Sequence, residues 1–289
     1  MALNYHGLMI LLIALLPAGL ITAYALWLKR LQASSRLSPF KELSRRPAGE
    51  YLRLKLQALD EAMEFNILGL VLFPVTMVLA WLSQPNPGLM SFVLCGTVYA
   101  IATVYFGFKL SKLLPKRADY QLGYEGERYV GEELTRLIGL GFEIYHDVPF
   151  DGFNIDHVLV GARGVFIVET KTRRKPITVL GDKQYRVQFD GQRLIWPFGA
   201  DGHGVQQAIG NAKTLSAWLG SACGEKVWVT PILTLPGWMV ERLAPPDGLH
   251  VLNPKEIKQV CASYSVQLSE GQVRRILHQM DQRCRLEVE

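Results

Sequence analysis

The feature that most limits how this chain can fold is an apolar stretch near its N-terminus. Residues 7–28 contain no charged side chain. A helix of that length, at about 1.5 Å per residue, crosses the roughly 30 Å hydrocarbon layer of a membrane. Two further apolar stretches cover residues 66–82 and 88–110, and only residues 83–87 separate them. We therefore expect three transmembrane α-helices, of which the last two form a hairpin.

Two other interpretations of these stretches stay open. Residues 23–25 (Ala-Tyr-Ala) resemble a signal-peptide cleavage site, although no Lys or Arg precedes the first stretch, which is also longer than a usual signal core. The second and third stretches could be buried helices of a soluble protein, although few such helices run this long without charge. Three spans explain the uncharged lengths better.

The distribution of Lys and Arg predicts the orientation in the membrane. The loop over residues 29–65 carries eight basic residues, and residues 109–117 carry four, whereas residues 83–87 carry none. Basic loops remain on the cytoplasmic side. We expect an integral protein of the inner (plasma) membrane, with the lipid bilayer as one partner, the N-terminus outside and the soluble part in the cytoplasm. The four cysteines, none in a metal-ligand spacing, are expected to be reduced thiols.

The soluble part begins with a predicted helix over residues 124–138. The apolar residues that recur at helical spacing are Val130, Leu134, Leu137 and Ile138, and residues 139–141 (Gly-Leu-Gly) end the pattern. Glu127 lies on the same apolar face, where a carboxylate needs a partner. The alternative is that Glu127 is a first-turn residue favoured by the helix dipole.

Three strands are predicted next, over residues 142–148, 154–161 and 164–171. The last two form a hairpin around Ala162-Arg163, and pairing Gly161 with Gly164 places Asp156 opposite Glu169. Opposed residues on antiparallel strands have Cβ atoms only about 4.5–5.5 Å apart, so two carboxylates there repel each other. Side-chain alternation adds Lys171 to the same face. A divalent cation between the carboxylates would turn this repulsion into attraction.

Several segments resemble one family. They are Gly-Tyr-Glu-Gly-Glu at 123–127, Asn-Ile-Asp-His-Val-Leu-Val-Gly at 154–161, Gly-Val-Phe-Ile-Val-Glu-Thr-Lys at 164–171, and Gln207 with Asn211 and Lys213. Together they are similar to the nuclease-related domain (NERD) family, over about residues 121–240. The resemblance implies an α/β restriction-endonuclease-like domain, a mixed sheet flanked by helices, after the three transmembrane helices. It also implies metal-site carboxylates at Glu127, Asp156 and Glu169 and catalytic roles for Lys171 and Gln207.

The predicted organisation is a membrane anchor over residues 1–117, a nuclease-like domain over 118–240 and a C-terminal helical extension over 241–289. Phosphodiester hydrolysis needs charge neutralisation at the phosphate and a nucleophilic water, and carboxylate-held Mg²⁺, or alternatively Mn²⁺, supplies both. Lys171 would assist the water or the phosphate. Its alternative role is an ordinary salt bridge to Glu169.

A basic segment follows the Glu-x-Lys motif and suggests a nucleic-acid partner. Residues 171–193 hold seven basic residues against two acidic ones, an excess of five that equals the net charge of +5 of the whole chain. Tyr185, Phe189 and Trp196 alternate with the basic residues in a predicted hairpin that turns at Asp190-Gly191 and would offer stacking surfaces. The alternative is a solvated edge hairpin with inward aromatics. The expected nucleic-acid contacts are Arg173, Arg174, Lys175, Lys183 and Arg186.

The remaining candidates have weaker signals. His157 is expected on the opposite sheet face as a hydrogen-bonded structural residue, and His203 in a loop before a helix over residues 205–219. Asn253-Pro254 and Ser269 with Gln272 predict the starts of two C-terminal helices. These helices or the spans are where a second copy or a protein partner is expected to bind.

Two functions are compatible with these patterns. The first is a membrane-anchored, Mg²⁺-dependent nuclease that hydrolyses cytoplasmic nucleic acid, with DNA the expected substrate. The second is a non-catalytic, membrane-tethered module that binds nucleic acid or protein with the same fold. Intact carboxylates at Glu127, Asp156 and Glu169 favour the nuclease, because a surface that only binds phosphates gains nothing from them.

Overall fold

The computed structural model describes residues 45–84, 88–177, 181–245 and 247–284, together with Leu20, Ala23, Tyr24, Trp27 and Leu28. The chain divides into two compact units. One includes residues 57–84 and 88–118, and the other includes residues 45–56 and the described residues from Asp119 onward. The expected first span, residues 7–28, lies almost entirely outside the described residues.

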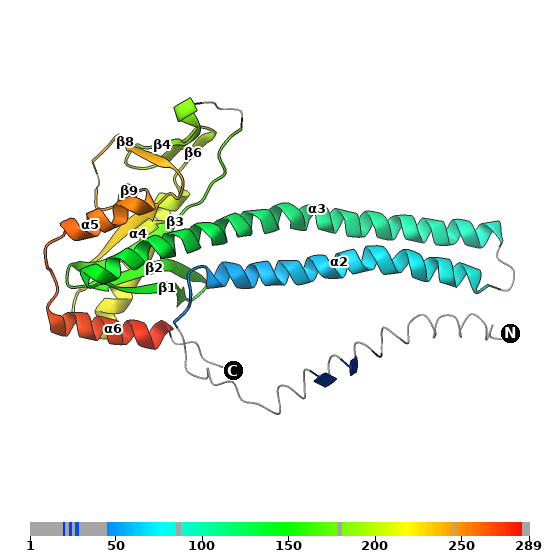
Figure 1. Cartoon of the computed structure of the whole chain (residues 1–289), viewed down its shortest axis with the longest axis horizontal. Coiled ribbons are helices and arrows are strands. Elements are labelled where there is room, and N and C mark those ends of the chain that lie inside the picture. The colour runs from blue at the N-terminus through cyan, green and yellow to red at the C-terminus, as the bar shows by residue number, and fades with distance from the viewer. Residues whose placement is uncertain are drawn as a thin grey trace. The chain divides into compact units, whose positions relative to one another are not determined.

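The first unit is a helical hairpin built from parts of α2 (Glu50–Leu82) and α3 (Leu89–Leu134). The two helices lie side by side (Figure 1), with the Trp81 ring edge-on to Phe92 at 5.7 Å and an ion pair between Asp60 and Arg117. Both helices are long and apolar enough to cross a membrane, and almost none of their apolar surface is buried. The predicted hairpin of apolar helices is therefore present, although this does not establish that it crosses a membrane.

The second unit is a mixed α/β domain organised on a five-stranded sheet. Its strands are β1 (Glu143–Phe150), β2 (Phe153–Gly161), β3 (Gly164–Thr170), β7 (Val229–Thr234) and β9 (His250–Leu252), in the order β1-β2-β3-β7-β9. The first three strands are antiparallel, whereas β3, β7 and β9 run parallel. β3 is buried along its whole length, which fits its continuous apolar sequence.

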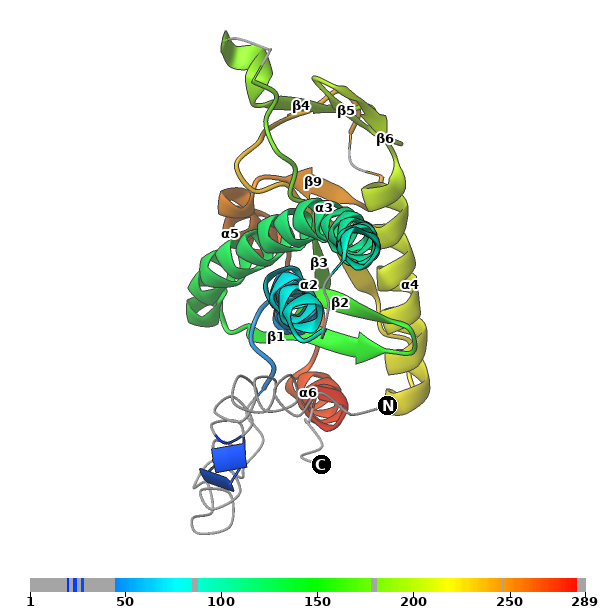
Figure 2. The same cartoon turned by 90° about the vertical axis from the view of Figure 1, so that its right-hand side faces the viewer.

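Helices cover both faces of this sheet (Figure 2). On one face, α4 (His203–Cys223) and α6 (Glu270–Cys284) pack on Val158, Val165 and Ile167. On the other face, the end of α3, the 3₁₀ helix η1 (Thr135–Leu140) and α5 (Ile257–Ser263) pack on Phe166 and Val168. The alternation of β3 therefore divides its side chains between two hydrophobic cores.

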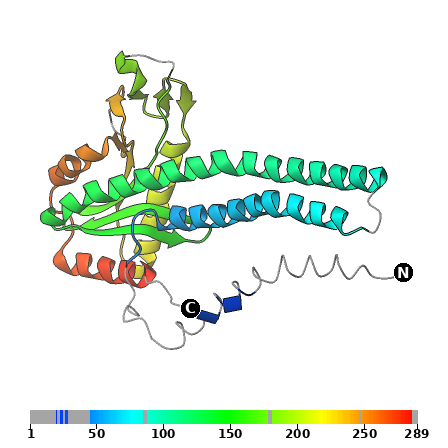
Figure 3. The same ribbon diagram turned by 45° about the vertical axis from the view of Figure 1, so that its right-hand side comes forward.

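A second, four-stranded sheet stands at one end of the first (Figure 3). It consists of β4 (Arg186–Phe189), β5 (Leu194–Trp196), β6 (Gly199–Asp201) and β8 (Met239–Arg242), in the order β6-β5-β4-β8. The 3₁₀ helix η2 (Gly181–Gln184) precedes β4. The predicted turn at Asp190-Gly191 is confirmed, since the Asp190 carboxylate accepts from the backbone N–H of Gln192 and Arg193.

The C-terminal segment belongs to the same unit. The 3₁₀ helix η3 (Pro254–Glu256) begins after Asn253, and Ser269 with Gln272 forms the predicted capping box before α6. Strand β9 was not predicted, because three residues are too few to show a period. Cys95, Cys223, Cys261 and Cys284 are free thiols, as expected.

Two helix boundaries differ from the expectation. α2 begins at Glu50, well before residue 66, and α3 continues without interruption through the region where a span and a separate helix were expected. The helix changes to 3₁₀ geometry at Thr135, so Leu137 is buried, whereas Ile138 is 62% exposed. The assignment of Ile138 to the apolar face was therefore wrong, although Gly141 ends the helix as predicted.

Gly126 tests the packing of α3 against the end of the sheet. A Cβ at Gly126 would lie 1.9 Å from Thr172 Oγ1, so we expect Gly126→Ala to lower the free energy of unfolding by about 1–3 kcal/mol. Gly139→Ala is the control, because nothing lies within 4 Å of its added Cβ, and its effect should stay within about 0.5 kcal/mol. Equal effects in chemical denaturation would contradict this close approach.

Candidate active site

The β2–β3 hairpin positions the two carboxylates that the sequence singled out. The predicted register is confirmed, since Gly161 pairs with Gly164 and the ladder continues to His157 and Val168. Asp156 and Glu169 come directly after that last pair. There the Thr170 backbone N–H donates to Asp156 Oδ2 at 2.8 Å. Asp156 is therefore held at the strand end by the backbone of β3.

Side-chain alternation turns both carboxylates toward α4. Asp156 shares its sheet face with Val158, and Glu169 shares its face with Ile167. Val158 and Ile167 belong to the core that packs against α4. His157 faces the other way and lies 2.8 Å from His146, Nδ1 to Nδ1. Burial lowers the pKa of both histidines. The prediction of a structural, hydrogen-bonded His157 is confirmed.

Glu169 is the centre of a hydrogen-bonded group between β3 and α4. It is 1% exposed, and its two oxygens accept from Lys171 Nζ at 2.9 Å and from Asn211 Nδ2 at 3.0 Å. Lys171 Nζ also donates to Gln207 Oε1 at 2.8 Å. The ion pair proposed as the alternative role of Lys171 is therefore present. Gln207 joins it from one turn of α4, and Asn211 joins it from the next.

The start of α4 lies close to Lys171. A Cβ at Gly204 would be 3.0 Å from Lys171 Cγ, so the lysine stem lies against the helix at a residue without a side chain. His203, expected in a loop, is instead the first residue of α4, where its backbone N–H donates to Asp201 Oδ1 at 2.8 Å.

Glu127 lies within electrostatic reach of these groups from α3. Burial first, then the charges of Asp147 and Glu169, raise the pKa of Glu127 to about 8, and Lys171 opposes the shift. Burial, Glu169 and Glu127 raise the pKa of Asp156 well above its ordinary value. Burial also raises the pKa of Glu169, against the ion pair with Lys171. Besides burial, the charge of Glu169 therefore favours the neutral forms of both Glu127 and Asp156.

Asp147 is an acidic residue near the site that the sequence analysis missed. It lies on β1, is 2% exposed and has a φ of 51°, which non-glycine residues rarely adopt. Its carboxylate accepts from Asn154 Nδ2 at 2.7 Å and from the backbone N–H of Tyr51, in the first turn of α2. The only signal for Asp147 in the sequence was an acidic residue within an apolar strand. Side-chain alternation assigns such a residue to the exposed face of the strand.

The donors fit a hard divalent cation in kind, because carboxylate oxygens are the ligands that Mg²⁺ prefers. Their raised pKa values show uncompensated negative charge, which a cation would relieve. Among the described residues, however, no three acidic, histidine or cysteine side chains converge closely enough to hold a metal as they stand. A metal site formed by Glu127, Asp156 and Glu169 is therefore a proposal.

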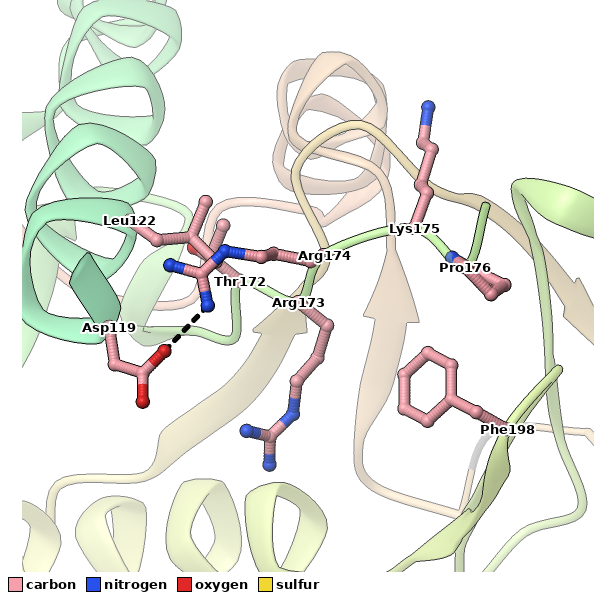
Figure 4. Close-up of a pocket in the computed structure, with 8 residues that line it drawn as sticks. All are labelled: Asp119, Leu122, Thr172, Arg173, Arg174, Lys175, Pro176 and Phe198. Carbon is pink, nitrogen blue, oxygen red and sulfur yellow. Dashed lines mark hydrogen bonds and ion pairs between the residues drawn. The ribbon is translucent and has the colours of Figure 1, made fainter. Parts of the chain in front are cut away.

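The predicted nucleic-acid contacts do not all lie together. Arg173, Arg174 and Lys175 line a cavity of about 500 Å³ together with Phe198 (Figure 4). Arg186 lies on β4 and pairs with Glu241 at 3.7 Å, and the side chain of Lys183 lies outside what the structure describes. Phe189 and Trp196 are buried, so these two predicted stacking surfaces are not available.

Residues 122–236 match the family model of the nuclease-related domain. Over this range the chain is similar to that family. All five predicted catalytic residues, Glu127, Asp156, Glu169, Lys171 and Gln207, fall within the matched range. No curated protein and no solved structure matches the chain. The NERD domain points to a nuclease-related function and to nucleic acid as its substrate.

The pKa of Glu127 predicts a pH dependence of metal-free stability. The folded chain binds this proton up to about pH 8, whereas the unfolded chain releases it near 4.5, so stability should fall as the pH rises through this window. Glu127→Gln should flatten the dependence and raise the free energy of unfolding at pH 8 by on the order of 1 kcal/mol, since one pKa unit is worth about 1.4 kcal/mol.

Urea unfolding in EDTA at pH 5.5 and pH 8 measures this difference. Glu132→Gln is the control, because the Glu132 side chain is 70% exposed on the same helix and its change should leave the wild-type slope intact. Parallel pH profiles for wild type and Glu127→Gln would show that Glu127 has an ordinary pKa.

Proposed function

We propose that the NERD domain is a metal-dependent nuclease that hydrolyses phosphodiester bonds of cytoplasmic nucleic acid, with DNA as the expected substrate, while the helical hairpin anchors it in the membrane. The observation that carries this proposal is the position of Lys171. Its ammonium group is fixed by Glu169 and Gln207 at the end of β3, within reach of the Asp156 and Glu127 charges. The family match to residues 122–236 supports it.

Each residue has a defined task in this proposal. Glu127, Asp156 and Glu169 would hold Mg²⁺ or Mn²⁺, and Asn211 orients Glu169 by donating to its second oxygen. A bound cation supplies charge neutralisation at the phosphate and a water of lowered pKa. Lys171 is 24% exposed in its side chain, so its ammonium group can donate a hydrogen bond to a phosphate oxygen or to the oxygen of an attacking water. Gln207 keeps that ammonium in place.

A second function is favoured by a specific observation. Both Glu169 oxygens already accept hydrogen bonds. Among the described residues, no three acidic, histidine or cysteine side chains lie close enough together to hold a metal ion. The same group would serve as a structural clamp in a non-catalytic module that binds nucleic acid or protein. The two functions differ in whether a divalent cation binds and whether Lys171 is needed for cleavage.

The nuclease proposal predicts that full-length protein in detergent cleaves linear, circular or single-stranded DNA only with Mg²⁺ or Mn²⁺. Lys171→Ala and Asp156→Asn should each reduce cleavage by more than about a hundredfold, because the first removes the ammonium group at the reacting phosphate and the second removes a ligand of the proposed cation. Glu132→Gln is the control and should cleave like wild type. Cleavage that persists in both site variants would contradict the proposed site, and absence of metal-dependent cleavage by wild type would leave only the binding module.

Melting curves of Asp156→Asn distinguish a metal ligand from a structural carboxylate. Without metal, removing one of several like charges should stabilise the protein by on the order of 1 kcal/mol, and Asn can still accept from the Thr170 N–H. With Mg²⁺ the order should reverse, because a ligand stabilises only the protein that binds it. A lower metal-free melting temperature, with no Mg²⁺ effect on either protein, would assign Asp156 a structural role.

The anchor predicts a topology. The basic residues on both sides of the hairpin should retain residues 29–65 and the NERD domain in the cytoplasm. A reporter enzyme that works only outside the cytoplasm should be active when fused after Gln84 and silent when fused at the C-terminus. Activity of the C-terminal fusion would contradict the cytoplasmic placement, and silence at both sites would contradict the membrane hairpin.

A further inference from the structure

The cavity beside the candidate active site has two kinds of wall. Arg173 and Arg174 form one part, and the ring of Phe198 faces it from the second sheet (Figure 4). Lys175 lines the same cavity, but its side chain points away from the two guanidinium groups in this view. The volume of about 500 Å³ is in the range of small-molecule sites. A ligand that suits both walls has an anionic group and a flat apolar ring.

Phe198 is a large apolar residue that the fold leaves exposed. Trp196 pairs with Gly199 across the turn between β5 and β6, so Phe198 lies at the tip of a tight hairpin. It is 53% exposed, yet its ring stacks on that of Trp196, at 5.8 Å between centroids and 11° between planes. Trp196 covers one face of Phe198. Trp238 lies edge-on to the same ring at 6.2 Å, and the exposed part of Phe198 lines the cavity, where it can contact a further ring.

The ring behind Phe198 is fixed in place. Trp196 is 4% exposed and packs edge-on to Trp238, which is 1% exposed, at 4.9 Å. Trp238 Nε1 in turn donates to the Arg173 backbone carbonyl at 3.2 Å. The aromatic stack is therefore bonded to the segment that follows Lys171, and the cavity lies next to the proposed catalytic group.

The two arginine side chains of this cavity form ion pairs with exposed or half-buried carboxylates. Arg174 pairs with Asp119 at 2.6 Å, and Arg173 pairs with Asp201 at 3.2 Å. Three of the four side chains are half or more exposed and Asp201 is 32% exposed, and exposed ion pairs contribute little to stability. A phosphate can therefore replace either carboxylate at small cost and gain two-point hydrogen bonding from a guanidinium group.

We propose that this cavity binds one unpaired nucleotide, with its base stacked on Phe198 and its phosphate held by Arg173 and Arg174. The proposal rests on the nuclease function and adds the substrate class, which is single-stranded nucleic acid or frayed ends. A base inside a duplex has both faces covered by its neighbours, so it must leave the stack before it can lie on Phe198. Single strands pay no such cost.

Binding of fluorescein-labelled DNA to full-length protein in EDTA tests the proposal. The probes are an eight-nucleotide oligothymidylate and a blunt duplex hairpin of matched charge, followed by anisotropy. Phe198→Ala should weaken binding of the single strand about tenfold, given the stacking energy of one base on an aromatic ring. Binding of the duplex should change by less than about twofold, and Phe198→Tyr should restore the preference.

Phe153→Ala is the matched control. Phe153 is 39% exposed and stacks on Phe150 at 5.4 Å and 14°, so it resembles Phe198 in kind, but it does not line this cavity. Its loss should leave binding of both probes unchanged. Melting temperatures of each variant establish that the fold is retained.

Asp119→Asn is a variant that should strengthen, and not weaken, binding of the single strand. It releases Arg174 from its carboxylate, so binding of the single strand should tighten by about threefold, a gain that no structural role of Asp119 would give. Weaker binding, or an equal effect of Phe198→Ala on both probes, would overturn the proposal. If wild type binds both probes equally well, or binds neither in EDTA, this inference fails, and the Mg²⁺-dependent cleavage assay decides the nuclease proposal separately.

Discussion

The buried carboxylate of Glu169 requires a positive partner, because an uncompensated charge at 1% exposure would cost several kcal/mol. Lys171 and Asn211 satisfy it from two different elements, so β3 and α4 must meet at this point and in this rotation. The end of β3 then places the Thr170 N–H on Asp156. The same interaction thus determines which face of α4 meets the sheet and how the two strand-end carboxylates are held. A shift of α4 by one residue would remove the bond from Asn211 to Glu169, and a shift of β2 along β3 would remove the bond from Thr170 to Asp156.

Much of this arrangement could be predicted from the sequence, because short-range constraints determine it. Gly161 and Gly164 bracket a two-residue turn, and the turn fixes the register that brings Asp156 and Glu169 to one end of the hairpin. Alternation then assigned His157 to the opposite face. Gln207 could be connected to Lys171 only through the family resemblance, since nothing in the local pattern links α4 to β3.

The features that were missed depend on contacts between distant segments. The sequence alone suggests that Asp147 is a surface residue of β1. In the structure its carboxylate accepts hydrogen bonds from the Tyr51 backbone N–H and the Asn154 amide. The aromatic residues after the Glu-x-Lys motif indicated stacking, but a sequence cannot tell which ring the fold buries. Trp196 became the support and Phe198 the exposed surface, because Trp196 ends β5 whereas Phe198 lies in the β5–β6 turn.

The bond from Tyr51 to Asp147 also bears on how this protein can be divided. The unit that contains the sheet is not one continuous stretch of chain, because residues 45–56 belong to it and are followed by more than sixty residues of the other unit. A cut at residue 118 would leave Asp147 without its backbone donor and would remove Ala48 from its place beside Gly131. Separating the sheet-containing unit from the helical hairpin therefore calls for a deletion that joins Leu56 to Asp119 through a linker, so that the start of α2 is kept.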